Sequence, residues 1–283
     1  MSDLDRLNVV ANRIMANLGS LKFSSRNDVY SDSQFTLFEG TVETQNGNDV
    51  LVATTPAGTS FAQTFIITDS QLKTGNGNDI VKGDGSAGFQ CNGILLASFS
   101  QSGLSEIDTG NGNDIVIGLG SVNGFGIANF SAQLRTGSGN DTIIGRSASS
   151  SLGIYNFGLI DTGSGNDQII ASGLSNGGTI NMGSGNDLIN VEDGDGSGGD
   201  IRFGEGNDIA KGLQSGRLDG GAGFDIVRMK EGVYNIALSE TSFQVGGSLF
   251  LTGFEAIGSL QGGIVPLRAG VLNVTDSGSV FYG

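Results

Sequence analysis

The sequence that decides the fold lies at residues 74–81 and reads Thr-Gly-Asn-Gly-Asn-Asp-Ile-Val. The same pattern or a close variant occurs eight times in the 283 residues of the chain, and its copies end at Asp49, Asp79, Asp114, Asp141, Asp167, Asp187, Asp208 and Asp225. Consecutive aspartates are separated by 17 to 35 residues. Repetition on this scale is typical of stacked folds in which each repeat forms one turn.

Aliphatic residues flank every aspartate at fixed distances. Seven residues before it stand Val42, Leu72, Ile107, Leu134, Ile160, Ile180, Ile201 and Leu218, and two residues after it stand Leu51, Val81, Val116, Ile143, Ile169, Ile189, Ala210 and Val227. The residue six before each aspartate is always polar. This short alternation predicts strands rather than helices. Each unit should therefore be a strand, a glycine-rich turn that uses positive φ angles, and a second strand.

The segments between the motifs indicate a further face of the stack. Residues 126–130 (Gly-Ile-Ala-Asn-Phe) and 153–157 (Gly-Ile-Tyr-Asn-Phe) are near copies of each other, and both precede an aspartate motif. We therefore expect an all-β parallel β-helix or β-roll over residues 44–227, which narrows as the later repeats shorten.

The two ends of the chain do not follow the repeat. Residues 1–43 should form an N-terminal cap and first strands, with a helix over residues 3–18, where apolar residues recur every three or four positions. We expect this helix to cover the open first turn rather than to bind a membrane, because its polar face has no Lys/Arg cluster. Residues 228–283 alternate without the motif and should form a C-terminal β cap that could also carry a secretion signal.

Composition limits the partners of the chain. Fourteen Lys and Arg against 29 Asp and Glu give a net charge of −15, which argues against nucleic acid and favours cations. A single cysteine and no histidine exclude an intramolecular disulfide and remove the commonest general base and metal ligand. No run of residues is long and apolar enough to span a bilayer, and no cleavable secretory signal is visible at the N-terminus.

Stacking the motifs brings eight carboxyl groups into one column. Adjacent turns of a parallel stack lie about 4.8 Å apart. Two bare carboxylates at that spacing would repel by roughly 3–4 kcal/mol at an effective dielectric constant near 20. The motif brings no regular Lys or Arg to the column. Divalent cations between turns are the simplest compensation, and a site of oxygen ligands alone favours Ca²⁺.

At these residues the sequence resembles the RTX, or hemolysin-type, calcium-binding family, whose repeat is Gly-Gly-x-Gly-x-Asp-x-aliphatic-x. Residues 220–227 (Gly-Gly-Ala-Gly-Phe-Asp-Ile-Val) fit every fixed position of that repeat. The resemblance implies a right-handed parallel β-roll, calcium held between turns, secretion by a type I-like route without a cleaved N-terminal signal, and folding outside the cell. It also implies that the eight aspartates bind calcium together with main-chain oxygens around Gly75, Gly77, Gly110, Gly112, Gly137, Gly139, Gly163, Gly165, Gly183, Gly185, Gly204, Gly206, Gly221 and Gly223.

The chain departs from the family pattern in the length of its repeat. The family motif recurs every nine residues, whereas here it occurs once per 17–35 residues. One calcium-loaded edge on a wider β-helix fits this spacing better than a narrow two-sided roll. The alternative for the motif is a metal-free ladder of turn hydrogen bonds, and we expect such a ladder for the neighbouring asparagines, Asn48 to Asn207. Residues 193–200 (Asp-Gly-Asp-Gly-Ser-Gly-Gly-Asp) begin like a second calcium loop, but we favour a flexible acidic turn for them.

Three functions are compatible with this sequence. The first is a secreted structural protein that folds on binding Ca²⁺ and self-assembles into a surface layer, filament or matrix. The second is a calcium-dependent enzyme that modifies polysaccharide, which we do not expect because basic residues are few and form no catalytic cluster. The third is a polysaccharide-binding or carrier module of a larger system.

Overall fold

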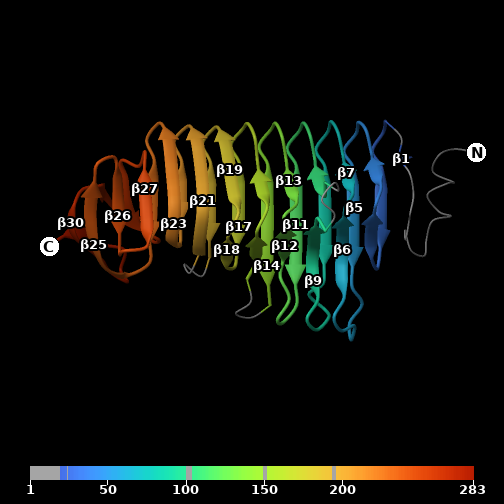
Figure 1. Ribbon diagram of the computed structural model, residues 1–283, viewed down its shortest axis with the longest axis horizontal. Helices are drawn as coiled ribbons and strands as arrows, with labels where there is room; N and C mark the ends of the chain where they lie inside the picture. The colour runs from blue at the N-terminus through green and yellow to red at the C-terminus, as the bar shows by residue number, and fades with distance from the viewer. Residues whose placement is uncertain (1–19, 24, 100–103, 149–151, 193–195) are drawn as a thin grey trace, which may run out of the picture.

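The computed structural model describes residues 20–23, 25–99, 104–148, 152–192 and 196–283. These residues form a solenoid of parallel strands, and no helix occurs among them. Figure 1 shows the coils side by side along the long axis, from β1 (blue) to the C-terminal strands (red). The predicted helix over residues 3–18 lies outside the described residues.

Each coil contains up to three strands. The strand before the aspartate turn belongs to the series β1 (Ser20–Lys22), β4 (Thr41–Glu43), β7 (Gln71–Lys73), β10 (Glu106–Asp108), β13 (Gln133–Arg135), β16 (Leu159–Asp161), β19 (Thr179–Ser184), β21 (Gly196–Glu205), β23 (Leu213–Ala222) and β27 (Leu249–Thr252). Neighbours in this series pair parallel and in register, so that Val42 lies beside Leu72 and Leu134 beside Ile160.

The strand after the aspartate turn forms a second sheet. It contains β2 (Val29–Asp32), β5 (Val50–Thr54), β8 (Ile80–Asp84), β11 (Ile115–Gly120), β14 (Thr142–Ser147), β17 (Gln168–Ala171), β20 (Leu188–Val191), β22 (Ile209–Lys211), β24 (Ile226–Met229) and β28 (Ala256–Ser259). The parallel stack thus extends beyond the predicted repeat region at both ends, because β2 pairs with β5 and β28 with β24.

A third series completes the early coils on the side away from the aspartates. It consists of β3 (Phe35–Phe38), β6 (Gln63–Thr68), β9 (Asn92–Ala97), β12 (Ile127–Phe130), β15 (Ile154–Asn156) and β18 (Leu174–Asn176). The predicted alignment of residues 126–130 with 153–157 is confirmed, since Ile127 pairs with Ile154. In the later, shorter coils this series merges into the long strands β21 and β23, as β18 pairs directly with β21.

The core is a set of stacked apolar rows between the two sheets. Both predicted aliphatic rows are buried, with side chains at most 2% exposed. On the third series, Phe35 stacks on Phe65 with ring centroids 4.3 Å apart. Most strands of the stack bury one face and leave the polar residue beside it at least partly exposed. This alternation explains why short segments suffice to specify the fold.

Antiparallel strands close the C-terminal end of the stack. They are β25 (Gly232–Ser239), β26 (Ser242–Val245), β29 (Ile264–Pro266), β30 (Gly270–Val274) and β31 (Val280–Tyr282). β26 pairs with β27, and β29 pairs with β28, so the last strand of each sheet has a partner. This arrangement agrees with the expected C-terminal β cap and leaves no long strand edge open there.

Candidate functional site: a column of buried carboxyl groups

The eight predicted aspartates form one continuous hydrogen-bonded column. Each follows the turn between the two sheets, and in the first seven the backbone N–H donates to Oδ1 of the aspartate in the next coil. The seven N···Oδ1 distances are 2.7 or 2.8 Å. One carboxyl oxygen per residue therefore has a structural role, as the acceptor that joins two coils.

The column is longer than the sequence motif indicates. Above Asp49, the N–H of Asp28 donates to Asp49 Oδ1 over 2.7 Å. Below Asp225, Glu255 Oε2 accepts the Asp225 N–H over 2.8 Å and takes the place of a ninth aspartate. Asp49 and Asp225 are thus not the ends of the column.

Sequence reasoning missed these two copies because neither contains the Gly-x-Gly turn. A weaker signal was present in both. Residues 27–30 read Asn-Asp-Val-Tyr, and residues 254–257 read Phe-Glu-Ala-Ile, so each retains an acid followed two positions later by a large apolar residue. Those apolar residues are in register with the core rows, as Tyr30 pairs with Leu51 and Ile257 with Val227.

The second carboxyl oxygen, Oδ2, is buried and accepts no hydrogen bond in all eight aspartates. The residues themselves are at most 2% exposed. A buried anionic oxygen without a partner is costly, and a group in this position either neutralises by binding a proton or binds a cation.

Burial raises the pKa of every one of the eight carboxyl groups above its ordinary value. The pKa reaches about 7 for Asp114 and Asp187, and about 6 for Asp167 and Asp225. For these four groups, neighbouring carboxyl groups raise the pKa further, while the backbone N–H that donates to Oδ1 lowers it. Without a cation, desolvation outweighs that hydrogen bond.

Buried threonines accompany the first five carboxyl groups. They stand five residues before the aspartate, and each donates its hydroxyl proton to a main-chain carbonyl of the next coil, as Thr44 does to Thr74 over 2.9 Å. These hydroxyls lower the pKa of the carboxyl groups beside them. Since the hydroxyl proton is directed at a carbonyl, Oδ2 still has no donor.

The asparagines that precede the aspartates form a second ladder, as predicted. The N–H of Asn78 donates to Asn48 Oδ1 over 2.8 Å, and the same bond repeats from Asn27 down to Phe224. The bonds run in the opposite direction to those of the aspartates. Each Asn-Asp pair is consequently tied to the coil above by one N–H and to the coil below by the other.

The motif glycines allow the backbones of neighbouring coils to approach closely. All fourteen predicted turn glycines have positive φ. A Cβ at Gly112 would lie 1.6 Å from the Gly77 carbonyl oxygen, which no side chain could tolerate. The carbonyl of Gly110 accepts the Ser138 N–H over 2.9 Å, and those of Gly75, Gly137 and Gly163 accept equivalent bonds. These carbonyl oxygens therefore already accept a hydrogen bond from the next coil, and each has one lone pair left.

The acids of the column do not cluster as the side-chain ligands of a single ion. Within the described parts of the chain, no group of three or more His, Cys, Asp and Glu side chains is arranged to hold a metal. An ion at the column would need main-chain oxygens or water beside one or two carboxyl oxygens. In the other predicted loop, Asp193 lies outside the described residues, and Asp200 is exposed on β21 in register with Arg217.

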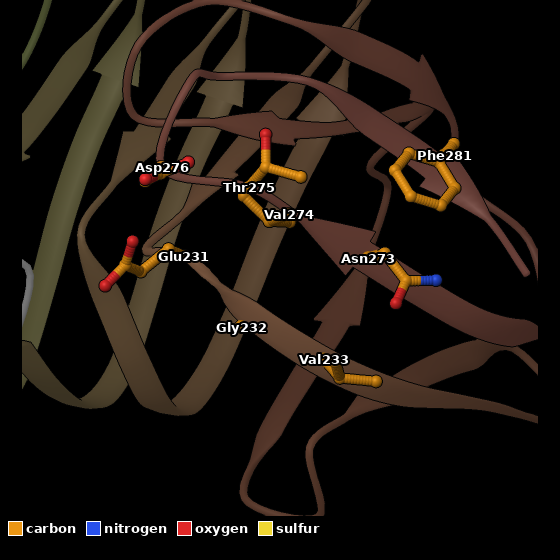
Figure 2. Close-up of a pocket in the computed structure, with 8 residues that line it drawn as sticks. All are labelled: Glu231, Gly232, Val233, Asn273, Val274, Thr275, Asp276 and Phe281. Atoms are coloured by element: carbon orange, nitrogen blue, oxygen red, sulfur yellow. The ribbon is translucent and has the colours of Figure 1, made fainter.

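Two further surface features are a cluster of aromatic rings and a groove with a mixed polar and apolar lining. Tyr155 stacks on Phe125 with ring centroids 4.8 Å apart and also contacts Phe130 and Phe157 on the outer face of β12 and β15. A shallow groove of about 500 Å³ lies on the C-terminal cap. Figure 2 shows Glu231 and Asp276 at one end of this groove and Phe281 at the other.

No protein-family model matches the chain. No curated protein matches it either. Among the described residues, no helix is long and apolar enough to cross a membrane.

Proposed function

We propose that the protein is an RTX-like, calcium-binding structural solenoid whose folding outside the cell depends on Ca²⁺. The observation that carries the proposal is the row of eight buried Oδ2 atoms without hydrogen-bond partners. Near neutral pH, a buried carboxyl group of this kind would have to bind a proton unless a cation stabilised its charged form. A hard divalent cation would provide that stabilisation.

The chain offers suitable ligands for such ions in oxygen atoms alone. Oδ2 of Asp79, Asp114 and their equivalents would supply the charge, and the turn carbonyls would contribute their remaining lone pairs. A bound Ca²⁺ would neutralise adjacent carboxylates and join consecutive coils. Without an ion, the column keeps the hydrogen bonds to Oδ1, but its carboxyl groups must be protonated and neutral.

The calcium affinity expected of such sites suits the calcium concentration outside the cell rather than that of the cytosol. Sites with only one or two carboxylate ligands resemble the weaker extracellular class of calcium modules, which bind in the range of about 10⁻⁴–10⁻³ M. The chain would stay largely unfolded at cytosolic calcium and become a rigid rod after secretion. Its regular surface then suits assembly into a layer, filament or matrix.

Calcium titration of the full chain tests this proposal. We expect far-UV circular dichroism at pH 7.5 to show little β structure in chelator and a cooperative gain of β signal at millimolar Ca²⁺. Mg²⁺ at the same concentration should be less effective, because it gives up its water less readily. A spectrum that is fully β in chelator and unchanged by Ca²⁺ would refute calcium-dependent folding.

Polysaccharide binding is a second candidate, favoured by exposed aromatic rings. The side chains of Phe61 and Phe99 are 70% and 78% exposed, and rings of this kind can pack on the apolar faces of sugars. A glycan array probed with the calcium-loaded protein tests this function. Binding that weakens in a Phe61→Ala variant would support it, and an array without signal would rule it out for the glycans displayed.

A further inference from the structure

The second sheet carries aliphatic side chains on its outer face as well as in the core. Its inward-pointing residues, such as Val116 and Ile143, form one of the buried core rows. The residues on either side of each core residue point outward and are partly or fully exposed. Each of the nine strands from β2 to β24 has at least one Val, Ile or Leu at these outward positions. The molecule thus has an apolar face on its surface.

The outward side chains form one continuous patch, because the strands are stacked in register. Ile117, Ile144 and Ile170 are neighbours on the three successive strands β11, β14 and β17. Figure 1 shows the coils side by side with their strands nearly parallel, so the patch follows the long axis of the rod. Monomeric proteins rarely expose an apolar face of this extent, and such patches mark sites of interaction.

The charged side chains of this face do not oppose contact between two copies. Along the nine strands and the residue after β20, the outward charged residues are Lys82, Asp84, Arg146, Glu192, Lys211 and Arg228. Asp84 is paired with Lys82 over 3.0 Å. Glu192 is paired with Arg146 over 2.6 Å. Although the chain has a net charge of −15, two of these faces in contact bring no unpaired acids together.

The area of the face is sufficient for a stable pair. Its nine strands, about 4.8 Å apart, extend over about 43 Å, and the two outward positions of each strand cover about 13 Å across it. Two copies packed face to face would therefore bury about 1,100 Å² in total, which is within the range that a specific interface needs. Flat sheets with rows of aliphatic side chains pack in this way at a separation of about 10 Å.

We propose that the outer face of the second sheet is the interface between two copies of the chain, which pack face to face about a two-fold axis. The row of Ile117, Ile144 and Ile170 lies at the centre of this interface. The inference rests on the self-assembly included in the proposed function and names the surface that it uses. Of calcium, it requires only that the chain is folded.

Substitution of Ile144 by lysine tests the interface. Ile144→Lys should fold normally, because Lys82 and Lys211 hold the same place relative to the aspartate in their own coils. Thr179→Lys adds an equal charge at a partly exposed position of β19, in the other sheet, and is the matched control. We expect the dimer of Ile144→Lys to be about a hundredfold weaker than that of the wild type, because both copies lose an aliphatic contact and bury an ammonium group. Thr179→Lys should dimerise like the wild type.

Analytical ultracentrifugation at micromolar concentration measures the dimer, in millimolar Ca²⁺ at pH 7.5 and in chelator at pH 5, with circular dichroism as the check of folding. If Ile144→Lys does not fold, Ile170→Asn, which introduces the residue of the next coil at this position, should weaken the dimer instead. A folded wild type that stays monomeric would overturn the interface, and binding of that monomer to phosphatidylserine vesicles would assign the face to a membrane surface. A dimer that Ile144→Lys leaves intact would overturn it as well. If Ca²⁺ does not fold the chain at pH 7.5, the proposed calcium function fails, whereas the measurement at pH 5 still decides the interface.

Discussion

The aspartate of the motif uses its two oxygen atoms for different purposes. Oδ1 accepts a backbone N–H of the preceding coil, whereas Oδ2 is buried with no partner. The first role needs only an acceptor oxygen and would be served by asparagine. The second distinguishes aspartate from asparagine, and the regular choice of an acid at a fully buried position therefore indicates a role for its charge.

Substitution of Asp141, in the middle of the column, separates the two roles. Asp141→Asn keeps the acceptor for the Asp114 N–H and replaces Oδ2 by an amide that can donate to the Thr136 hydroxyl oxygen. In chelator at pH 5, where the protonated column keeps the apo chain folded, this variant should unfold in urea at a midpoint equal to or above that of the wild type. Asp141→Ala leaves the Asp114 N–H without a partner and should lose about 1–3 kcal/mol of unfolding free energy.

Calcium should reverse the order of Asp141→Asn and the wild type, because the amide cannot replace a carboxylate as a ligand. Asp108→Asn, at a partly exposed position on β10, removes an equal charge and is the control. If Asp141→Asn responds to Ca²⁺ as fully as the wild type, the charge of Oδ2 has no part in calcium binding.

At the scale of the coil, the Asn and Asp ladders together decide how consecutive turns are held. The two ladders run in opposite directions through adjacent residues, so that no Asn-Asp pair can shift register without breaking bonds on both sides. The aspartate ladder depends on protonation and cations, whereas the asparagine ladder does not. The stability of the whole stack should thus respond to pH through one ladder only.

In chelator, the unfolding free energy should fall as pH rises from 4 to 8. The folded-state pKa values of Asp114 and Asp187 are about 7, and those of Asp167 and Asp225 about 6, all above the unfolded value for aspartate of about 3.9. A raised folded pKa means that the folded chain holds more protons, so the stabilisation is complete below about pH 4 and is lost as pH rises through 6 to 7.

Urea unfolding at several pH values, followed by circular dichroism, measures this loss, which should be on the order of several kcal/mol. Millimolar Ca²⁺ should flatten the profile by replacing the protons at high pH. A midpoint in chelator that stays constant from pH 4 to 8 would show that the column ionises without penalty.

The same elements show what the sequence could and could not predict. Strands around Leu72 and Val81 followed from alternation, and the column followed from the fixed place of Asp79 between them, because a parallel stack aligns equivalent positions. Asp28 and Glu255 could not be found in this way. Their coils lack the Gly-x-Gly pair that marks the turn. Only their apolar neighbours and their place in the ladder identify them. The repeat also does not predict whether a main-chain carbonyl of the turn accepts a hydrogen bond from the next coil or binds an ion.

Considered as a whole, the molecule is a stack that is closed at its C-terminal end. At the C-terminal end, β27 and β28 complete the sheets and are themselves paired antiparallel with β26 and β29. Such a cap leaves no parallel edge on which another copy could continue the stack. Assembly of the full chain into a layer or matrix should accordingly use the long sides of the rod rather than growth at this end.

Removal of the cap should create growth at that end. A chain that stops after Met229 loses β27 and β28, which leaves the outer edges of β23 and β24 unpaired and uncovers buried residues such as Leu218 and Val227. Unpaired edges of this kind associate with other strands. In Ca²⁺ and at micromolar concentration, we expect light scattering to report oligomers that lengthen with concentration, and electron microscopy to show rods longer than those of the full chain.

A chain that stops after Leu267 keeps β27, β28 and β29 and is the control, which should remain as short as the full chain. Equal rod lengths for the two truncated chains would mean that the cap does not limit growth, and that the stack is terminated by some property of the coils themselves.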